Sequence, residues 1–176
     1  MQTKQYAIWS KLNTSFNVER PKVTFSNTSY VRNVYVASRK YNRTNRLHFI
    51  TLRFELLRPF DNDYTMSYYV YELLSNAYKR TFVEFHSGFC DIFTTDNIFT
   101  EMVKESYNRT PVSQRPMKVL KCPMKPGSYT FDDMKLSLMD VPDNFPFNQG
   151  RLFLNCTHKG NIVSSGYVDV ELRKVD

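Results

Sequence analysis

The sequence predicts an all-β protein, an antiparallel sandwich or barrel that carries one short helix. Segments rich in aromatic and β-branched residues recur along the 176 residues, and apolar and polar side chains alternate within several of them. Turn residues separate these segments at intervals of about a dozen positions. The chain is short enough, at 20.9 kDa, for one domain over residues 1–176, and it contains no repeat and no low-complexity segment.

The first two predicted strands lie at residues 30–37 and 47–57. Residues 30–37, YVRNVYVA, are rich in Tyr and Val, which favour strands. Residues 47–57, LHFITLRFELL, alternate, which predicts a strand with one face toward a core. The apolar positions are Ile50, Leu52, Phe54 and Leu56, and the polar positions between them are Thr51, Arg53 and Glu55.

Two further predicted strands, at residues 65–74 and 80–85, are separated by the turn-forming residues Ser75 and Asn76. Residues 65–74, TMSYYVYELL, are apolar and aromatic, and residues 80–85, RTFVEF, form a shorter segment. Alternation returns near the end of the chain and predicts a last strand with one apolar side. Its apolar residues are Val168, Val170 and Leu172, and its polar residues are Asp169, Glu171 and Arg173.

The segment from Asp96 to Tyr107, DNIFTEMVKESY, predicts a short amphipathic helix, for which Asp96 is suited as the N-cap. An apolar helix face of this kind can close the end of a sheet core, or it can face a lipid or a membrane. The sequence alone favours the first role. The apolar face consists of Ile98, Phe99, Met102 and Val103, and the polar face of Glu101, Lys104 and Glu105.

Three cysteines, Cys90, Cys122 and Cys156, raise the choice between a metal site, a nucleophile and a disulfide. Zinc sites use closely spaced Cys and His ligands, but Cys90 and Cys122 are far apart and the three histidines occur singly. A catalytic cysteine needs a histidine partner, and no nucleophile motif surrounds any of the three. The pattern predicts no metal site and favours a disulfide.

Asn-X-Ser/Thr acceptor sites favour the secretory pathway, where paired thiols oxidise. The chain contains five of them, whereas chance gives about two. The first residues, MQTKQYAIWSKLNTSF, contain no continuous apolar segment that would act as a secretory signal. We therefore expect either an intracellular protein, or a mature chain or truncated gene model whose signal was left off. The acceptor asparagines are Asn13, Asn27, Asn42, Asn108 and Asn155.

The net charge of +7 and the pI near 9.3 raise the question of an acidic partner. Basic residues cluster between Arg32 and Arg46, with Tyr35 and Tyr41 among them. The sequence lacks an RNP-type strand, a zinc-finger spacing and a basic heptad helix, so we expect no nucleic-acid partner. A solvated basic face ranks first. Attraction to an anionic lipid surface, with transient membrane contact, or to an acidic carbohydrate ranks second, and nucleic acid ranks third.

The order of three motifs resembles the ML lipid-recognition family, in its ganglioside-activator-like branch. They are FCDIF at residues 89–93, CPMKPGSYTF at residues 122–131 and VPDNFPFNQGRL at residues 141–152. The resemblance covers roughly the last half of the chain, and the first 60 residues add little. Within this branch, residues 71–91, YELLSNAYKRTFVEFHSGFCD, are most similar to the insect chemosensory B proteins.

The resemblance implies an immunoglobulin-like antiparallel sandwich of the ML type, with a lipid-accessible cavity between two splayed sheets. It also implies a disulfide between Cys90 and Cys122. A second family bridge, from an early strand to the last strand, is missing because Tyr167 stands at the expected cysteine position and no cysteine precedes Cys90. Cys156 is left over, either as a buried free thiol or as a link to another chain.

The function implied by the resemblance is that of a secreted, nonenzymatic carrier of lipids or long-chain hydrocarbons. In the chemosensory relatives this means the perception of contact pheromones by taste organs. A second hypothesis is a cofactor that lifts a glycolipid from a membrane and presents it to a hydrolase. An enzyme of lipid metabolism ranks third, because the sequence has no Gly-x-Ser-x-Gly motif and no metal motif. We expect no cofactor.

The predicted ligand entrance combines the apolar helix face with the loop PDNFPFNQG at residues 142–150. Connecting segments usually run exposed and polar, so large apolar side chains there must meet the core, a ligand or a membrane. The resemblance implies that both segments border the mouth between the sheets. The predicted ligand-binding residues are Ile98, Phe99, Met102, Val103, Phe145 and Phe147.

Overall fold

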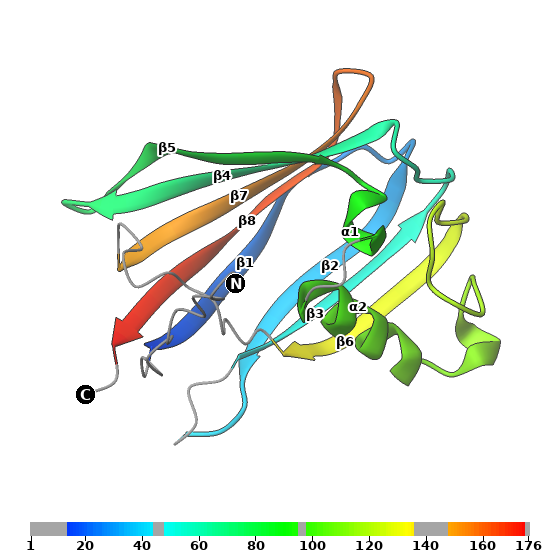
Figure 1. The fold of residues 1–176 in the computed structure, drawn as a ribbon, viewed down its shortest axis with the longest axis horizontal. Helices are drawn as coiled ribbons and strands as arrows, with labels where there is room; N and C mark the ends of the chain where they lie inside the picture. The colour runs from blue at the N-terminus through cyan, green and yellow to red at the C-terminus, as the bar shows by residue number, and fades with distance from the viewer. Residues whose placement is uncertain (1–13, 44–47, 95–97, 136–147, 175–176) are drawn as a thin grey trace, which may run out of the picture.

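The computed structural model describes residues 14–43, 48–94, 98–135 and 148–174, which form two antiparallel sheets and short helical segments (Figure 1). A wide sheet has the strand order β1-β8-β7-β4-β5, and a small sheet has the order β2-β3-β6. The strands are β1 (Thr14–Ser26), β2 (Val31–Lys40), β3 (His48–Leu56), β4 (Tyr64–Leu74), β5 (Ala77–Gly88), β6 (Gly127–Lys135), β7 (Gln149–His158) and β8 (Asn161–Lys174). The helical segments are α1 (Asp91–Thr94), α2 (Ile98–Arg109) and the 3₁₀ turn η1 (Val112–Gln114).

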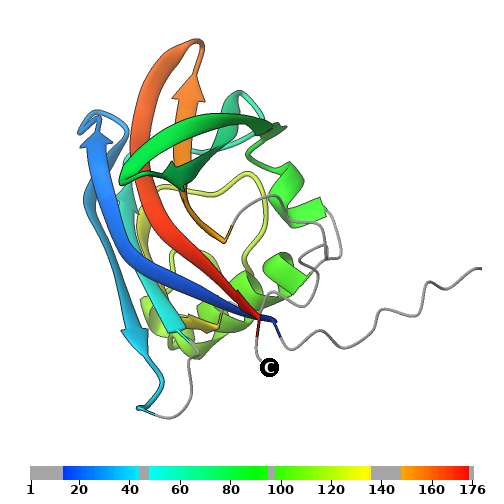
Figure 2. The ribbon, with the colours of Figure 1, turned by 90° about the vertical axis from the view of Figure 1, so that its left-hand side faces the viewer.

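The two sheets form two layers, and α2 lies beside β6 of the small sheet (Figures 1 and 2). This arrangement confirms the expectation of an all-β antiparallel sandwich. The helix predicted from Asp96 is found at Ile98–Arg109, and Asp96 itself lies outside the described residues. The additional helical turn α1 was not predicted, and the strand expected at residues 80–85 extends over Ala77–Gly88. None of the helices in the described ranges is long and apolar enough to cross a membrane.

Two tight turns set the registers of the hairpins in the wide sheet. Ser75 and Asn76 join β4 to β5 with φ angles of 49° and 63°, and Lys159 and Gly160 join β7 to β8 with φ angles of 50° and 79°. Two central residues with positive φ match the right-handed twist of the flanking strands. The turn predicted at Ser75 and Asn76 is confirmed.

Strand β3 shows the predicted alternation. Leu56 is buried, and Ile50, Leu52 and Phe54 pack against the core of the sandwich. On the opposite side, the Arg53 guanidinium is paired with the Asp132 carboxylate of β6 at 2.9 Å. One face of the small sheet therefore lies inside the sandwich and the other carries exposed charge pairs.

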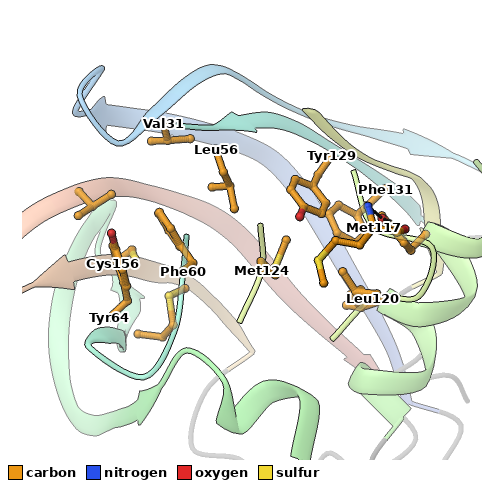
Figure 3. Packing of buried hydrophobic residues seen from close by; sticks show 14 of the residues in the cluster. Val31, Leu56, Phe60, Tyr64, Met117, Leu120, Met124, Tyr129, Phe131 and Cys156 are labelled. Atoms are coloured by element: carbon orange, nitrogen blue, oxygen red, sulfur yellow. Dashed lines mark hydrogen bonds between the residues drawn. The ribbon is translucent and has the colours of Figure 1, made fainter. Parts of the chain in front are cut away.

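The buried core extends from the end of the sandwich where β4 begins to the end where α2 packs (Figure 3). At the first end, the Phe60 and Tyr64 rings stack with centroids 4.0 Å apart, and Cys156 lies nearby. At the other end, Tyr129 and Phe131 lie close to Met117 and Leu120. Met124 lies between the two groups. Aromatic rings and flexible methionines thus fill the space where the sheets are in contact.

The predicted disulfide between Cys90 and Cys122 is confirmed, with the two Cα atoms 5.5 Å apart. It links the turn that follows β5 to the segment that leads into β6, and it closes a loop with a sequence separation of 32 residues. The loop contains α1, α2 and η1, so the bond fastens the helical part of the chain to the sandwich. Cys156 is free and buried.

Candidate functional site

The wide sheet carries a row of apolar side chains toward the small sheet, which we call the inner surface. Tyr68 of β4 is opposite Phe85 of β5 and Leu154 of β7. Directly paired residues share one face of a sheet, and Tyr68 and Leu154 pack against the core, so this face is inside the sandwich. The next row adds three residues by the same registers. The inner surface consists of Tyr68, Val70, Phe85, Leu152, Leu154 and Val168.

The inner surface is only partly covered. Val70 is buried, but Tyr68, Leu152, Leu154 and Val168 are half-buried, and the Phe85 residue is 61% exposed. Across the sandwich, Ile50, Leu52 and Phe54 of the small sheet are also half-buried. Apolar surface left in water costs about 25 cal/mol per Å². An apolar guest that covered these side chains would recover that free energy.

The interior beside the inner surface disfavours charge. Burial raises the pKa of the Cys156 thiol to about 12. Burial also raises the pKa of Tyr68, whose β4 neighbour Met66 is paired directly with Cys156. Both shifts have the direction expected for an apolar environment, which disfavours the charged form of each group.

The raised pKa of Cys156 predicts a loss of stability in alkali. The folded state disfavours the thiolate, so this contribution is complete below the ordinary thiol pKa of 9.0 and is lost as the pH rises toward about 12. We expect the stability advantage of the wild type over Cys156→Ala to shrink by about 2–3 kcal/mol between pH 7 and pH 11. Urea denaturation at both pH values measures it. A constant difference would show that the thiol is not desolvated.

Two of the six predicted ligand-binding residues have described side chains, and both are in the core. Met102 and Val103 are each 9% exposed and belong to the buried cluster. The helix face therefore covers the core at its end of the sandwich, which is the role that the sequence favoured. The side chains of Ile98 and Phe99 lie outside the described residues, as do Phe145 and Phe147. Ligand contact by these residues stays a prediction.

The structure brings together residues that sequence reasoning did not single out. Tyr68 and Phe85 come from adjacent strands, and Leu154 comes from a strand about 70 residues further along the chain. Period-two spacing could have placed Tyr68 with its buried neighbours Met66 and Val70. The pairing of β4 with β7 depends on long-range strand order, and nothing in the sequence pattern specifies it.

Four of the five predicted acceptor asparagines are described, and Asn13 lies outside the described residues. Asn27 occupies the connection between β1 and β2, and Asn42 is exposed just after β2. Asn108 is exposed in the last turn of α2, and Asn155 lies in the middle of β7. These positions are on the surface or are partly exposed.

Comparison of the chain with models of known protein families found no match, and comparison with curated protein sequences found none either. Within the described residues, no group of three or more His, Cys, Asp or Glu side chains is arranged to hold a metal ion.

Proposed function

We propose that the protein is a nonenzymatic binder of hydrophobic ligands, lipids or long-chain hydrocarbons, and that it acts outside the cell. The observation that carries this proposal is the partly covered inner surface. Its most exposed member is Phe85, which lies on the inner side of the edge strand β5 and is itself 61% exposed. Each methylene group of a guest that leaves water contributes about 0.8 kcal/mol. A chain of about sixteen carbons would gain on the order of 10 kcal/mol before ordering costs.

The Cys90–Cys122 disulfide and the accessible acceptor asparagines support an extracellular setting. The resemblance to the ML family, which implies an immunoglobulin-like sandwich with a cavity for acyl chains, supports the same ligand class. Within that family, the resemblance to chemosensory B proteins extends the proposal to the perception of hydrocarbon or lipid pheromones.

Among the described residues, one Ser–His–Glu arrangement is similar to the catalytic triad of a hydrolase. Its position in the wide sheet argues against catalysis. The Ser67 hydroxyl oxygen lies 2.8 Å from His86 Nδ1, and His86 Nε2 lies 3.3 Å from Glu84 Oε1. Ser67 is, however, only 6% exposed, and it stands in the middle of β4, paired on both sides. The backbone N–H groups around it are used in the sheet, which leaves no pair of donors for an oxyanion. The contact is better explained as a cross-strand hydrogen bond.

The proposal predicts that Phe85→Ser weakens the binding of a fluorescent fatty-acid probe about tenfold. The change removes a ring from the inner surface, and a tenfold effect corresponds to about 1.4 kcal/mol, within the range for one buried aromatic contact. Phe85 is mostly exposed, so the melting temperature should change little. Titration of the probe, with thermal unfolding in parallel, measures both quantities.

Phe82→Ser is the matched control, because Phe82 lies on the same strand and is 91% exposed. It should leave the affinity for the probe unchanged. Equal losses in the two variants would mean that the probe adheres to the strand edge. Absence of binding by the wild type, together with native mass spectra that show no copurified lipid, would refute the proposed function.

A further inference from the structure

The outer face of the wide sheet places an aromatic ring beside a predicted glycosylation acceptor. In β7, Leu154 and Cys156 point into the core, so Phe153, Asn155 and Thr157 lie on the outer face. These three residues occupy alternate positions of the sequence FLNCT, in which Asn155 is the acceptor and Thr157 completes the acceptor motif. Residues two apart on a strand are separated by about 7 Å. The ring and the acceptor amide are therefore direct neighbours on one surface.

The two rows of side chains that cross the sheet here differ in height. Asn155 is flanked by Ser67 of β4 and Ser165 of β8, which are small. In the adjacent row, Phe153 is flanked by the larger Tyr69 and Tyr167. A group attached to Asn155 would thus lie above the small serine side chains and beside the aromatic side chains of the adjacent row.

The Phe153 ring is held in a fixed aromatic cluster. Its centroid lies 4.6 Å from that of Tyr71 and 5.4 Å from that of Tyr167. The Arg151 guanidinium lies 3.8 Å from the Tyr167 centroid and is paired with Asp169 at 2.6 Å. These contacts hold the ring in place, and Phe153 is half-buried, so part of its surface remains open to solvent.

We infer that Asn155 carries an N-linked glycan whose first sugar stacks on the Phe153 ring. The C–H groups on one face of an N-acetylglucosamine ring are weakly positive, and the face of an aromatic ring is weakly negative, so the two attract and exclude water. The Asn155 amide has no hydrogen-bond partner in the described part of the chain, and it is partly exposed. The glycan is then a packed part of the outer face, independent of any ligand inside the sandwich.

The acceptor Asn108 provides an internal contrast. The residue two positions before it is Ser106, which is buried, so no aromatic ring precedes it on the exposed side of α2. The side-chain oxygen of Asn108 accepts a hydrogen bond from Arg115 at 3.3 Å. A glycan at Asn108 would extend from the end of the helix into solvent and would add little to stability.

A double-mutant cycle in the full chain, secreted from insect cells, tests the inference. Peptide mapping should find a glycan on Asn155. Asn155→Gln should lower the Tm by about 2–4 °C in the wild-type background and by less than 1 °C in a Phe153→Ala background. In a Phe153→Leu background, which keeps an apolar side chain but lacks the ring, Asn155→Gln should also lower the Tm by less than about 1 °C. This second background keeps the test usable if Phe153→Ala does not fold. When the proteins are produced in bacteria without glycosylation, Asn155→Gln should lower the Tm equally in the wild-type and Phe153→Ala backgrounds.

Asn108→Gln serves as the control variant and should change the Tm equally in both backgrounds. An unmodified Asn155 in the secreted protein would overturn the inference. Equal Tm shifts on loss of the Asn155 glycan, with and without the Phe153 ring, would overturn it as well. Neither result bears on the binding of a lipid probe, so the failure of this inference is distinguishable from the failure of the proposed function.

Discussion

Replacement of both Cys90 and Cys122 by alanine is expected to lower the free energy of unfolding by about 3–4 kcal/mol. The bond closes a loop with a sequence separation of 32 residues, and the cross-link restricts the unfolded chain more than the folded one. A domain of this size is typically stable by about 5–15 kcal/mol, so the variant should retain a fold but tolerate much less urea. Urea denaturation followed by circular dichroism measures the loss.

The reducing agent dithiothreitol provides the control for this experiment. It should shift the unfolding midpoint of the wild type toward that of the double variant, and it should leave the variant itself unchanged. Cys156 is free in both proteins, so its reduction state does not contribute. Equal stability of the wild type and the variant would show that the loop between the cysteines is fixed by packing alone.

Local features of the fold were predictable because they depend on near neighbours in the chain. The alternation of β3 predicted its buried face, and the residues Ser75 and Asn76 predicted a turn that the structure builds with two positive φ angles. The helical spacing of Met102 and Val103 predicted an amphipathic helix, which covers the core. Each of these signatures lies within about ten residues, and the physics that produces it is equally local.

The pairing of distant strands was not predictable by the same means. Nothing in the segments near Tyr68 and Leu154 indicates that β4 and β7 are neighbours, yet this pairing creates the inner surface. The disulfide was favoured by the cysteine pattern, but its pairing came from the resemblance to the ML family. Sequence spacing restricts which residues share a face of one strand and leaves open which strands share a sheet.

Asp169 shows how side chains far apart in the sequence alter an environment predicted from alternation. Its position in β8 predicted a polar outer side, and it does lie there, yet it is only 8% exposed. The carboxylate is paired with Arg151 at 2.6 Å and with Arg20 at 3.5 Å. The Arg151 guanidinium in turn lies over the Tyr167 ring, which helps to cover the pair. A charged residue that alternates with apolar residues in a strand can therefore be buried when oppositely charged side chains from other strands pair with it.

Replacement of Tyr107 by alanine is expected to lower the free energy of unfolding by about 3–5 kcal/mol. The Tyr107 residue is 1% exposed, and its ring lies against Tyr129 and Phe131 with centroid distances of 6.0 and 5.8 Å. Its hydroxyl donates a hydrogen bond to the Met117 carbonyl at 2.6 Å and accepts one from the Met117 N–H at 3.2 Å. The alanine variant would therefore leave a cavity and two buried backbone groups without partners.

Tyr107→Phe separates these two contributions, because it keeps the ring and removes only the hydroxyl. We expect it to cost about 1–3 kcal/mol, the penalty for burying the Met117 backbone groups unsatisfied. Tyr35, which is 53% exposed, provides the matched surface tyrosine, and Tyr35→Ala should change stability by less than about 0.5 kcal/mol.

If Tyr107→Ala cost no more than Tyr35→Ala, α2 would not be docked on the core. The apolar face that includes Met102 and Val103 would then be free to meet a ligand, as the entrance hypothesis requires. A large cost for Tyr107→Ala instead makes α2 a fixed part of the sandwich and directs ligand entry to the partly covered edge at Phe85.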